Sequence, residues 1–226
     1  MEDIRTLIIV PAYNEQDSID KTIDDIRTNL PGFDYLVVND GSTDRTAKLL
    51  DERGYNHIDL PVNLGLNGAV QGGYKYAYRN GYDCAVQFDG DGQHQARYIK
   101  DMVKEIENGY DIVIGSRFVV KRKGHSLRML GARILTVLVK WRTGVRIADP
   151  TSGMRMLNRK MIYDYAYNIN RRPEPDTVVY QMRRGAKIKE VQVEMNERTA
   201  GESLYKGLWS SAKYMISMVI SIIFLS

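Results

Sequence analysis

The chain has 226 residues, of which 43% are hydrophobic and 27% charged, and its formal net charge is +4. This length and composition exclude an intrinsically disordered chain and favour one domain with a sizeable core, alone or with an appendage. The single cysteine, Cys84, excludes an internal disulfide framework, and its apolar surroundings in the sequence predict a buried structural thiol in a reducing compartment. Since the N-terminus lacks a basic start followed by a long apolar stretch, we expect no secretory signal and a cytoplasmic globular part.

Short apolar runs alternate with helical patterns in the first half of the chain. Strands are expected at residues 7–10, 35–38, 57–60, 84–88 and 111–114, and helices at residues 18–30, 43–53, 68–80 and 96–108. This alternation predicts an α/β fold with a mostly parallel, doubly wound sheet that is covered on both faces. Because ligands of such sheets bind beyond the carboxyl ends of the strands, the chemistry is expected just after each apolar run.

The second half is less regular. Apolar residues recur at helical spacing from Leu127 to Trp141 with Arg and Lys between them, which predicts a basic amphipathic helix. A turn is expected at residues 149–153 and a strand at 187–193. The apolar stretch from Tyr214 to Leu225 is shorter than the roughly 20 residues that span a bilayer.

Charge is unevenly distributed, because no Asp or Glu occurs from Ser116 to Ala148 while Lys and Arg recur there. Such a block favours an anionic partner: nucleic acid, a phosphorylated ligand or an acidic membrane face. Nucleic acid is disfavoured, since the positive residues lie between apolar helix positions and no aromatic platform accompanies them. The basic helix is expected to lie on an anionic membrane surface, and the tail either to pack beside it or to begin a membrane anchor. The alternative is that both are core helices.

An acidic turn follows the expected strand at residues 84–88. Asp89 and Asp91, with Gln93 as a third oxygen ligand, suit a hard cation such as Mg²⁺ or Mn²⁺ that bridges a diphosphate. The neighbouring glycines permit close approach of a ligand. The alternative is a polar surface turn, and His94 could either contact the leaving diphosphate or cap the turn.

Polar segments also close the first two strands. Residues 11–15 and 39–44 place donors and acceptors at the carboxyl edge of the sheet, where the Asp40 carboxylate can accept hydrogen bonds from a nucleobase. Ser42 and Thr43 are expected to cap the following helix. The Asn63–Gly68 segment is either a close approach to a nucleotide or an ordinary loop.

Six segments taken together resemble a known family. They are Pro11–Glu15, Asn39–Asp44, Asn63–Gly68, Asp89–His94, Gly115–Arg117 and Asp149–Arg155. Their order resembles glycosyltransferase family 2 with the GT-A fold, a Rossmann-like architecture, over the chain to about Tyr205. The Asp89–His94 and Asp149–Arg155 segments are most similar to the polyprenyl-phosphate branch, which includes dolichol-phosphate mannose synthases and undecaprenyl-phosphate glucosyltransferases. Asn39 stands where the family commonly has Asp, and Met154 where an aromatic residue is common.

The resemblance implies specific roles for residues of this chain. The nucleotide site would comprise Pro11, Ala12, Tyr13, Glu15, Asp40, Asn67, Asp89 and Gly90, and the metal site Asp89, Asp91 and Gln93. The acceptor phosphate would be bound by Arg117, Arg155, Arg198 and Ser203. Arg133, which matches no motif of the family, is a further candidate because arginine binds phosphate with two-point geometry. The catalytic residues would be Asp89, Asp91, Asp149 and Arg117. Asp149 would orient the site or assist catalysis, with a turn-capping role as the alternative.

The resulting hypothesis is an inverting transferase at the cytoplasmic face of the cell membrane, serving cell-envelope glycan or glycoconjugate synthesis. It would move one sugar from UDP-glucose, a UDP-N-acetylhexosamine or GDP-mannose to a polyprenyl phosphate. Residues 1–203 would form the catalytic domain with an interfacial helix at about 126–142, and residues 204–226 a membrane-associated helix that could also serve a homo-oligomer. The alternatives are a family 2 transferase that extends a polysaccharide or glycolipid, with Asp149 as base, and a noncatalytic nucleotide-sugar-binding module.

Overall fold

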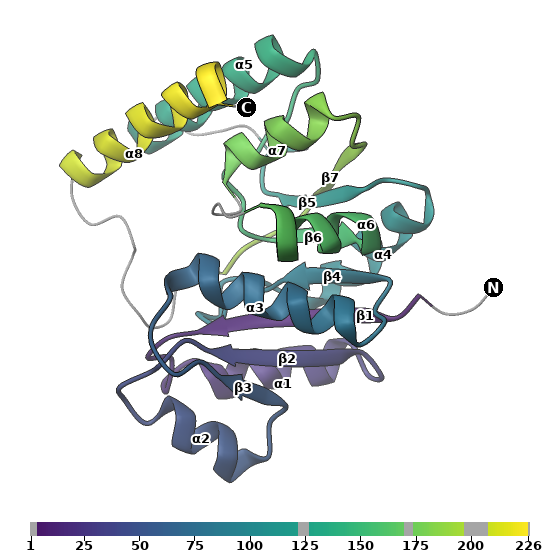
Figure 1. The fold of residues 1–226 in the computed structure, drawn as a ribbon, viewed down its shortest axis with the longest axis vertical. Helices are drawn as coiled ribbons and strands as arrows, with labels where there is room; N and C mark the ends of the chain where they lie inside the picture. Colours follow the sequence, from purple (N-terminus) through teal and green to yellow (C-terminus); the bar gives the residue numbers. More distant parts are fainter. Residues whose placement is uncertain (1–3, 122–126, 170–173, 197–207, 226) are drawn as a thin grey trace.

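A computed structural model of the protein describes residues 4–121, 127–169, 174–196 and 208–225. These residues form a seven-stranded sheet in the order β3-β2-β1-β4-β6-β5-β7 (Figure 1). Its strands are β1 (Thr6–Ala12), β2 (Asp34–Asn39), β3 (His57–Asp59), β4 (Cys84–Gln87), β5 (Ile112–Ser116), β6 (Arg155–Asn158) and β7 (Ile188–Gln192). Every pairing is parallel except those of β6, which runs antiparallel to β4 and β5.

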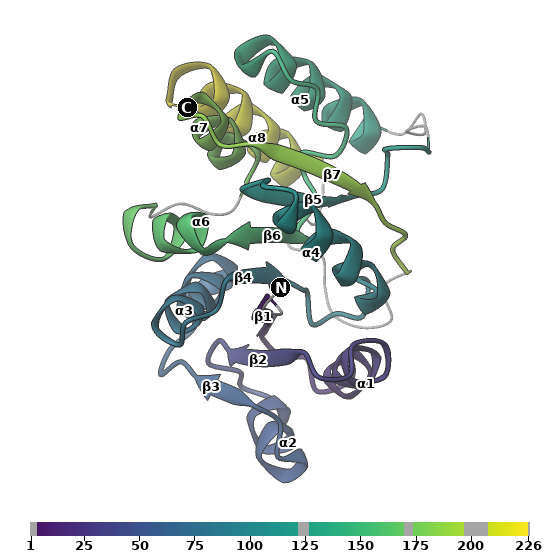
Figure 2. The ribbon, with the colours of Figure 1, turned by 90° about the vertical axis from the view of Figure 1, so that its right-hand side faces the viewer.

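Helices cover both faces of the sheet (Figure 2). One face packs against α1 (Ile19–Asn29), α2 (Thr46–Arg53), the 3₁₀ turn η1 (Ala96–Tyr98) and α4 (Ile99–Glu107), and the other against α3 (Gly65–Arg79), α6 (Arg159–Tyr163) and α7 (Pro175–Arg183). Strand β1 shows the reason, because its side chains alternate: Leu7 and Ile9 join one buried cluster, and Ile8 and Val10 join the other. The predicted mostly parallel, doubly wound α/β fold is therefore confirmed.

Strand β6 has no counterpart in the sequence prediction. It covers Arg155–Asn158, directly after the predicted turn, and lies between β4 and β5. The segment is short, begins with an arginine and ends with an asparagine, so its pattern does not indicate a buried strand. It forms because its backbone pairs with both neighbours, Met156 lying opposite Val86 and Val113.

Helices α5 (Leu127–Thr143) and α8 (Leu208–Ile220) lie side by side at the end of the sheet that carries β7 (Figure 1). A Cβ added at Gly131 of α5 would come 3.0 Å from the Met215 sulfur of α8, so the two helices approach closely. A π-helical turn, η3 (Ser221–Leu225), continues α8, and the Ser221 hydroxyl donates to buried Asp176 of α7 at 2.6 Å. Within the described ranges, no helix is both long and apolar enough to cross a membrane.

Candidate active site

The loops after β1 and β2 are hydrogen-bonded to each other at the carboxyl edge of the sheet. Asn14 has a positive φ of 57°, which turns its side-chain oxygen toward the backbone N–H groups of Thr43 and Asp44. In return, the Asn14 N–H donates to the Ser42 hydroxyl at 3.0 Å. The predicted helix-capping role of Ser42 and Thr43 is therefore wrong: α2 begins at Thr46, because the preceding residues pair with the β1 loop.

The β2 and β3 loops are joined at Asp40. Its backbone N–H donates to the Ala12 carbonyl at 2.8 Å, and its Oδ1 accepts the Leu64 N–H at 2.7 Å. Gly41, with φ of 64°, lets the two loops touch, since a Cβ there would lie 2.8 Å from the Asn63 nitrogen. Asp40 is buried, and its Oδ1 holds the Leu64 backbone in place at the residue expected to face a nucleobase.

The remaining residues expected to bind a nucleotide are placed as follows. Pro11 is buried at the end of β1, Tyr13 is exposed, and Glu15 accepts the Ser18 hydroxyl. Asn67 lies in the first turn of α3. Asn39, which stands in place of the family's usual Asp, donates to Asp59 at 2.6 Å and accepts the Ser42 N–H at 3.2 Å, so its amide is part of the same loop network.

The acidic turn follows β4 and lies against β1. The Asp89 N–H donates to His94 Nδ1 at 2.9 Å, and the Gln93 N–H donates to Asp91 Oδ1 at 3.0 Å. A Cβ at Gly90 would come 3.1 Å from the Pro11 carbonyl, and Thr22 of α1 donates to the Gly90 carbonyl at 3.0 Å. The structure thus brings the predicted nucleotide and metal segments together, and it gives His94 a role in folding the turn.

The residues of the acidic turn fit a hard divalent cation. Asp89 and Asp91 supply carboxylates within a single turn, and the side chain of Asp89 remains about one-third exposed. Among the described residues, no group of three or more His, Cys, Asp or Glu side chains is placed to bind a metal. A cation on these two carboxylates would therefore take its further oxygen ligands from Gln93 and from the diphosphate of a donor.

Arg117 and Asp149 form a two-point ion pair at the end of β5. Arg117 Nε lies 2.7 Å from Asp149 Oδ2, Nη2 lies 2.9 Å from Oδ1, and the Arg117 backbone N–H also donates to Oδ2 at 3.2 Å. The Asp149 side chain is fully buried, and that of Arg117 is 25% exposed. Burial lowers the pKa of Arg117, but the hydrogen bonds and charge of Asp149 outweigh it and raise that pKa above its ordinary value.

Glu190 of β7 holds the backbone that carries Asp149. Its two carboxylate oxygens accept the backbone N–H groups of Ala148 and Asp149, at 2.6 Å and 2.7 Å. The neighbouring Ser152 hydroxyl donates to the Gly115 carbonyl at 2.6 Å. The Asp149–Gly153 segment is therefore fixed to β5 and β7, and the Arg117 guanidinium is oriented by a rigid partner.

Arg155 does not join Arg117 at the surface. It is 2% exposed in β6, and its guanidinium donates to the carbonyls of Ser152, Pro150 and Glu174 at 2.9, 2.8 and 3.2 Å. The expectation that Arg155 binds the acceptor phosphate is corrected to a structural role, because the guanidinium is enclosed among backbone acceptors. Arg133 lies exposed on α5. Arg198 and Ser203 lie outside the described residues.

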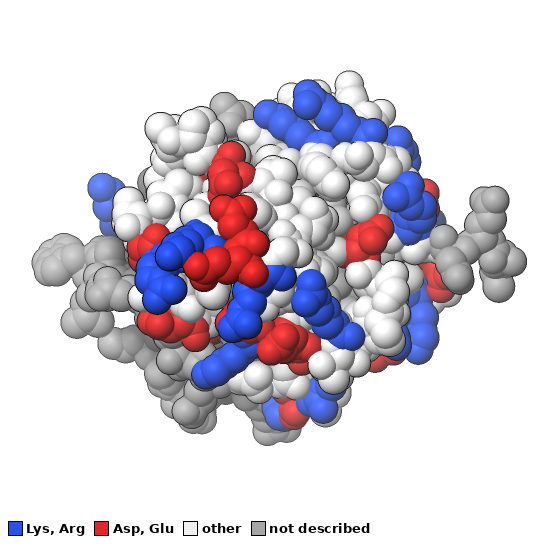
Figure 3. Space-filling model, turned by 90° about the horizontal axis from the view of Figure 1, so that it is seen from below, with Lys and Arg blue, Asp and Glu red and all other residues white. Residues whose placement is uncertain are grey.

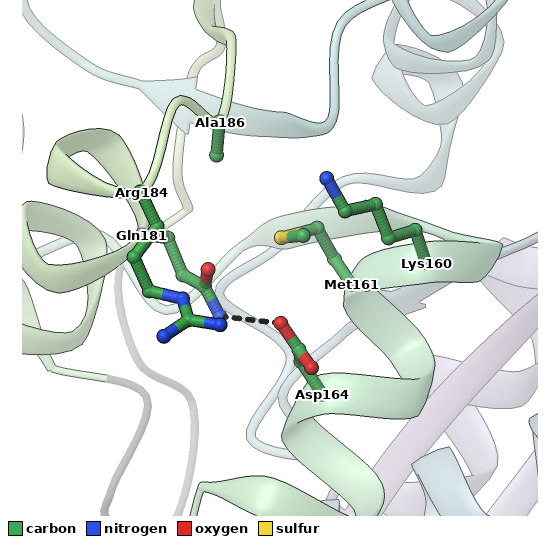
Figure 4. A pocket seen from close by; sticks show the side chains of 6 residues that line it. All are labelled: Lys160, Met161, Asp164, Gln181, Arg184 and Ala186. Atoms are coloured by element: carbon green, nitrogen blue, oxygen red, sulfur yellow. Dashed lines mark hydrogen bonds between the residues drawn. The ribbon is translucent and has the colours of Figure 1, made fainter.

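A small polar pocket lies at the opposite edge of the sheet. It is lined by Lys160, Met161, Asp164, Gln181, Arg184 and Ala186, and Gln181 donates to Asp164 at 3.3 Å (Figure 4). Because β6 is antiparallel, its last residue pairs with the first residue of β4, so α6 begins far from the acidic turn.

Cys84, the first residue of β4, is buried. Burial raises the pKa of its thiol to about 12, despite a hydrogen bond with Thr6.

Sequence reasoning did not single out Gln87 and Glu190. Gln87 is a buried amide that donates to Asp89 Oδ1 at 3.0 Å. In the sequence it is the one polar side chain in the apolar run from Cys84 to Phe88, and this interruption was a usable signal. Glu190 lies in a strand that also contains Lys189 and Gln192, so a further polar residue there gives no such signal.

Comparison with known proteins gives a consistent family match. A family model described as glycosyl transferase family 2 matches residues 7–166. The chain is 28% identical to the polyprenol monophosphomannose synthase of Mycolicibacterium smegmatis, over 90% of this chain and 82% of that protein. It is 30% identical to the UDP-N-acetylglucosamine–dolichyl-phosphate N-acetylglucosaminyltransferase of Methanococcus voltae, over 72% of each. Among solved structures, the glucosyl-3-phosphoglycerate synthase of Mycobacterium tuberculosis with Mn²⁺, UDP-glucose and phosphoglyceric acid has a TM-score of 0.74 at 19% identity, covering 97% of this chain and 80% of that one.

Proposed function

Because the chain belongs to glycosyl transferase family 2, we propose that it transfers one sugar from a nucleotide-sugar donor to a polyprenyl phosphate, with inversion at the anomeric carbon. Both relatives described above are named as enzymes that join a sugar to a polyprenol-type lipid phosphate. The two names differ in the sugar, so the donor is proposed only as a UDP-sugar or GDP-mannose.

The observation that carries this proposal is the buried ion pair of Arg117 and Asp149. A transferase that extends a polysaccharide needs a base that can remove a proton from a sugar hydroxyl. Asp149, the best candidate for that base, is fully buried and binds Arg117 through both oxygens. A phosphate acceptor is already an anion at neutral pH and needs no such base, whereas it does need a fixed cation, which Arg117 supplies.

In the proposed reaction, the donor and the acceptor are bound by different loops at the carboxyl edge of the sheet. The loops after β1 and β2, including Asp40, orient the nucleotide, and Arg117 orients the acceptor phosphate. Asp89, Asp91 and Gln93 are proposed to bind Mg²⁺ or Mn²⁺, which when bound offsets the negative charge of the nucleotide diphosphate. A phosphate oxygen of the lipid attacks the anomeric carbon, and the bond between that carbon and the nucleotide diphosphate breaks.

The outer face of α5 and α8 is proposed to lie on an anionic membrane. The two helices expose the apolar side chains Leu130, Ile134, Val137, Trp141, Ile216 and Ile220, and the following turn η3 exposes Phe224. Arg133 and Lys140 are exposed on the same helix α5, where they can contact acidic head groups. At the opposite end of the molecule, near α2, positive and negative side chains are interspersed (Figure 3). The α5–α8 face therefore has the character that a bilayer surface favours.

The experiment that tests the proposal measures sugar transfer. Labelled UDP-glucose, UDP-N-acetylglucosamine and GDP-mannose are incubated with the protein and a polyprenyl phosphate, with and without a chelator. We expect label from one donor in a butanol-extractable, acid-labile lipid, and loss of that signal on chelation. Competition by UDP or GDP identifies the nucleobase of the donor.

Variants connect this activity to the proposed site. Asp91→Ala should lower transfer by about 100-fold or more, while Asp101→Ala on the exposed surface of α4 should leave it unchanged. Label found only in polysaccharide or protein would contradict the lipid acceptor. Donor binding without transfer or hydrolysis would instead support the noncatalytic alternative.

A further inference from the structure

Gln87 is a buried polar residue at the inner edge of the acidic turn. It is the last residue of β4, is 1% exposed, and lies beside Ile9 of β1 in the sheet. Its Nε2 donates to Asp89 Oδ1 at 3.0 Å. Its Oε1 is buried and has no hydrogen-bond partner among the described residues. Burial of an amide in a central strand is unfavourable unless its hydrogen bonds are formed, so this residue calls for an explanation beyond packing.

The orientation of the Gln87 amide follows from its neighbour. An amide presents two N–H donors at one end and a carbonyl acceptor at the other, whereas an ionised carboxylate only accepts. The reverse orientation would place the Gln87 carbonyl against the Asp89 carboxylate, oxygen to oxygen. Gln87 therefore fixes Oδ1, while the backbone of Asp89 is fixed separately by its hydrogen bond to His94 Nδ1.

The second oxygen of Asp89 lies in a different environment. Oδ2 is 3.7 Å from His94 Nε2, beyond hydrogen-bond distance. A Cβ at Gly153 would lie 3.1 Å from Oδ2 and 3.5 Å from Gln87 Nε2. Gly153 thus passes over the carboxylate with its backbone alone, and any side chain there would crowd Oδ2.

From these contacts we infer that Gln87 is a positioning residue of the donor site, which fixes Asp89 Oδ1 so that Oδ2 is presented to the divalent cation. Gly153 keeps the approach to Oδ2 open. The inference rests on the proposed metal site but is independent of the acceptor. Groups that orient a metal ligand in this way commonly change metal affinity by 10- to 100-fold when they are replaced.

The test compares two buried glutamines that have the same kind of partner. Gln181 of α7 is also 1% exposed and donates to a carboxylate, Asp164, but it lies in the pocket at the opposite edge of the sheet (Figure 4). Gln87→Met and Gln181→Met make the same chemical change in the full chain. Mn²⁺ binding is measured by the loss of the free-ion electron paramagnetic resonance signal, with UDP and in parallel with GDP, after circular dichroism has confirmed the fold.

We expect Gln87→Met to raise the apparent Kd for Mn²⁺ by about tenfold or more, and Gln181→Met to leave it unchanged. An unchanged Kd in Gln87→Met, or an equal rise in both variants, would overturn the inference. Gln87→Leu replaces Gln87→Met if that variant does not fold. Gly153→Ala should also weaken Mn²⁺ binding, because the added methyl group would crowd Asp89 Oδ2. Unaltered binding in this variant would refute the role of Gly153.

The same measurement separates this inference from the proposed function. If the wild-type protein binds Mn²⁺ together with a nucleotide but makes no lipid-linked sugar, the proposed polyprenyl-phosphate acceptor is contradicted. The role inferred for Gln87 is then unaffected. If the wild-type protein fails to bind Mn²⁺ both in the presence of UDP and in the presence of GDP, the inference itself is overturned.

Discussion

Arg117 and Asp149 are 32 positions apart in the sequence and form a two-point ion pair, with Arg117 Nε 2.7 Å from Asp149 Oδ2. Asp149 is fully enclosed, and Arg117 keeps a quarter of its side chain at the surface. The buried carboxylate therefore orients the guanidinium, which keeps part of its surface open to solvent or to a ligand.

Asp149→Ala should destabilise the protein by about 3 kcal/mol, because it leaves Arg117 without its buried partner. Replacing both residues, as in Arg117→Met with Asp149→Leu, should cost less than Asp149→Ala alone. Urea unfolding measures both changes. Transfer should fall in every variant that loses Arg117. A hydroxyl acceptor with Asp149 as base predicts instead that Asp149→Ala abolishes activity while Arg117→Met retains it.

Arg155→Met should destabilise the fold by roughly 3 kcal/mol, because three backbone carbonyls lose a charged donor. Arg133→Met, at an exposed position of α5, is the matched control and should change stability by less than about 0.5 kcal/mol. Urea unfolding gives both values. A stable Arg155→Met protein with a raised KM for the lipid alone would restore the original phosphate-binding role.

Trp141→Ser should weaken binding to anionic lipid vesicles by about tenfold, because the exposed indole is expected to bury much of its apolar area in the interface. Tyr163→Ser removes an exposed aromatic side chain from α6, away from the α5–α8 face, and should have no effect. Co-sedimentation with vesicles at two salt concentrations measures both. Equal binding of Trp141→Ser and the wild type would show that this face does not contact the membrane.

Cys84 should make stability depend on alkaline pH. Its pKa is raised from an ordinary value of 9.0 to about 12 in the folded protein, so the folded state keeps the proton more strongly. The resulting stabilisation is complete below the unfolded pKa and is lost as pH rises through the folded pKa, by about 0.8 kcal/mol at pH 9.5. Cys84→Ala should abolish this part of the decline, which parallel urea titrations at pH 7.5 and 9.5 would detect. Identical declines would rule out Cys84 as the cause.

Much of the fold followed from local pattern. The alternation in β1 places Leu7 and Ile8 on opposite faces, and each apolar run ends where a polar segment begins. Since parallel strands direct their carboxyl ends to one edge, the sequence was sufficient to predict that Asp40 and Asp89 lie at the same side of the sheet. The position of the acidic turn beside the loops after β1 and β2 was predicted in this way.

Tertiary structure decided which of these side chains interact. Arg117 and Arg155 are both arginines beside a strand end, and no local pattern distinguishes the one that reaches the surface from the one that is enclosed. The difference arises because β6 inserts antiparallel between β4 and β5, which places Arg155 among backbone carbonyls and Asp149 against Arg117. Hydrogen-bond partners that are distant in sequence depend on strand order, whereas periodicity along the chain reports only which face of an element is buried.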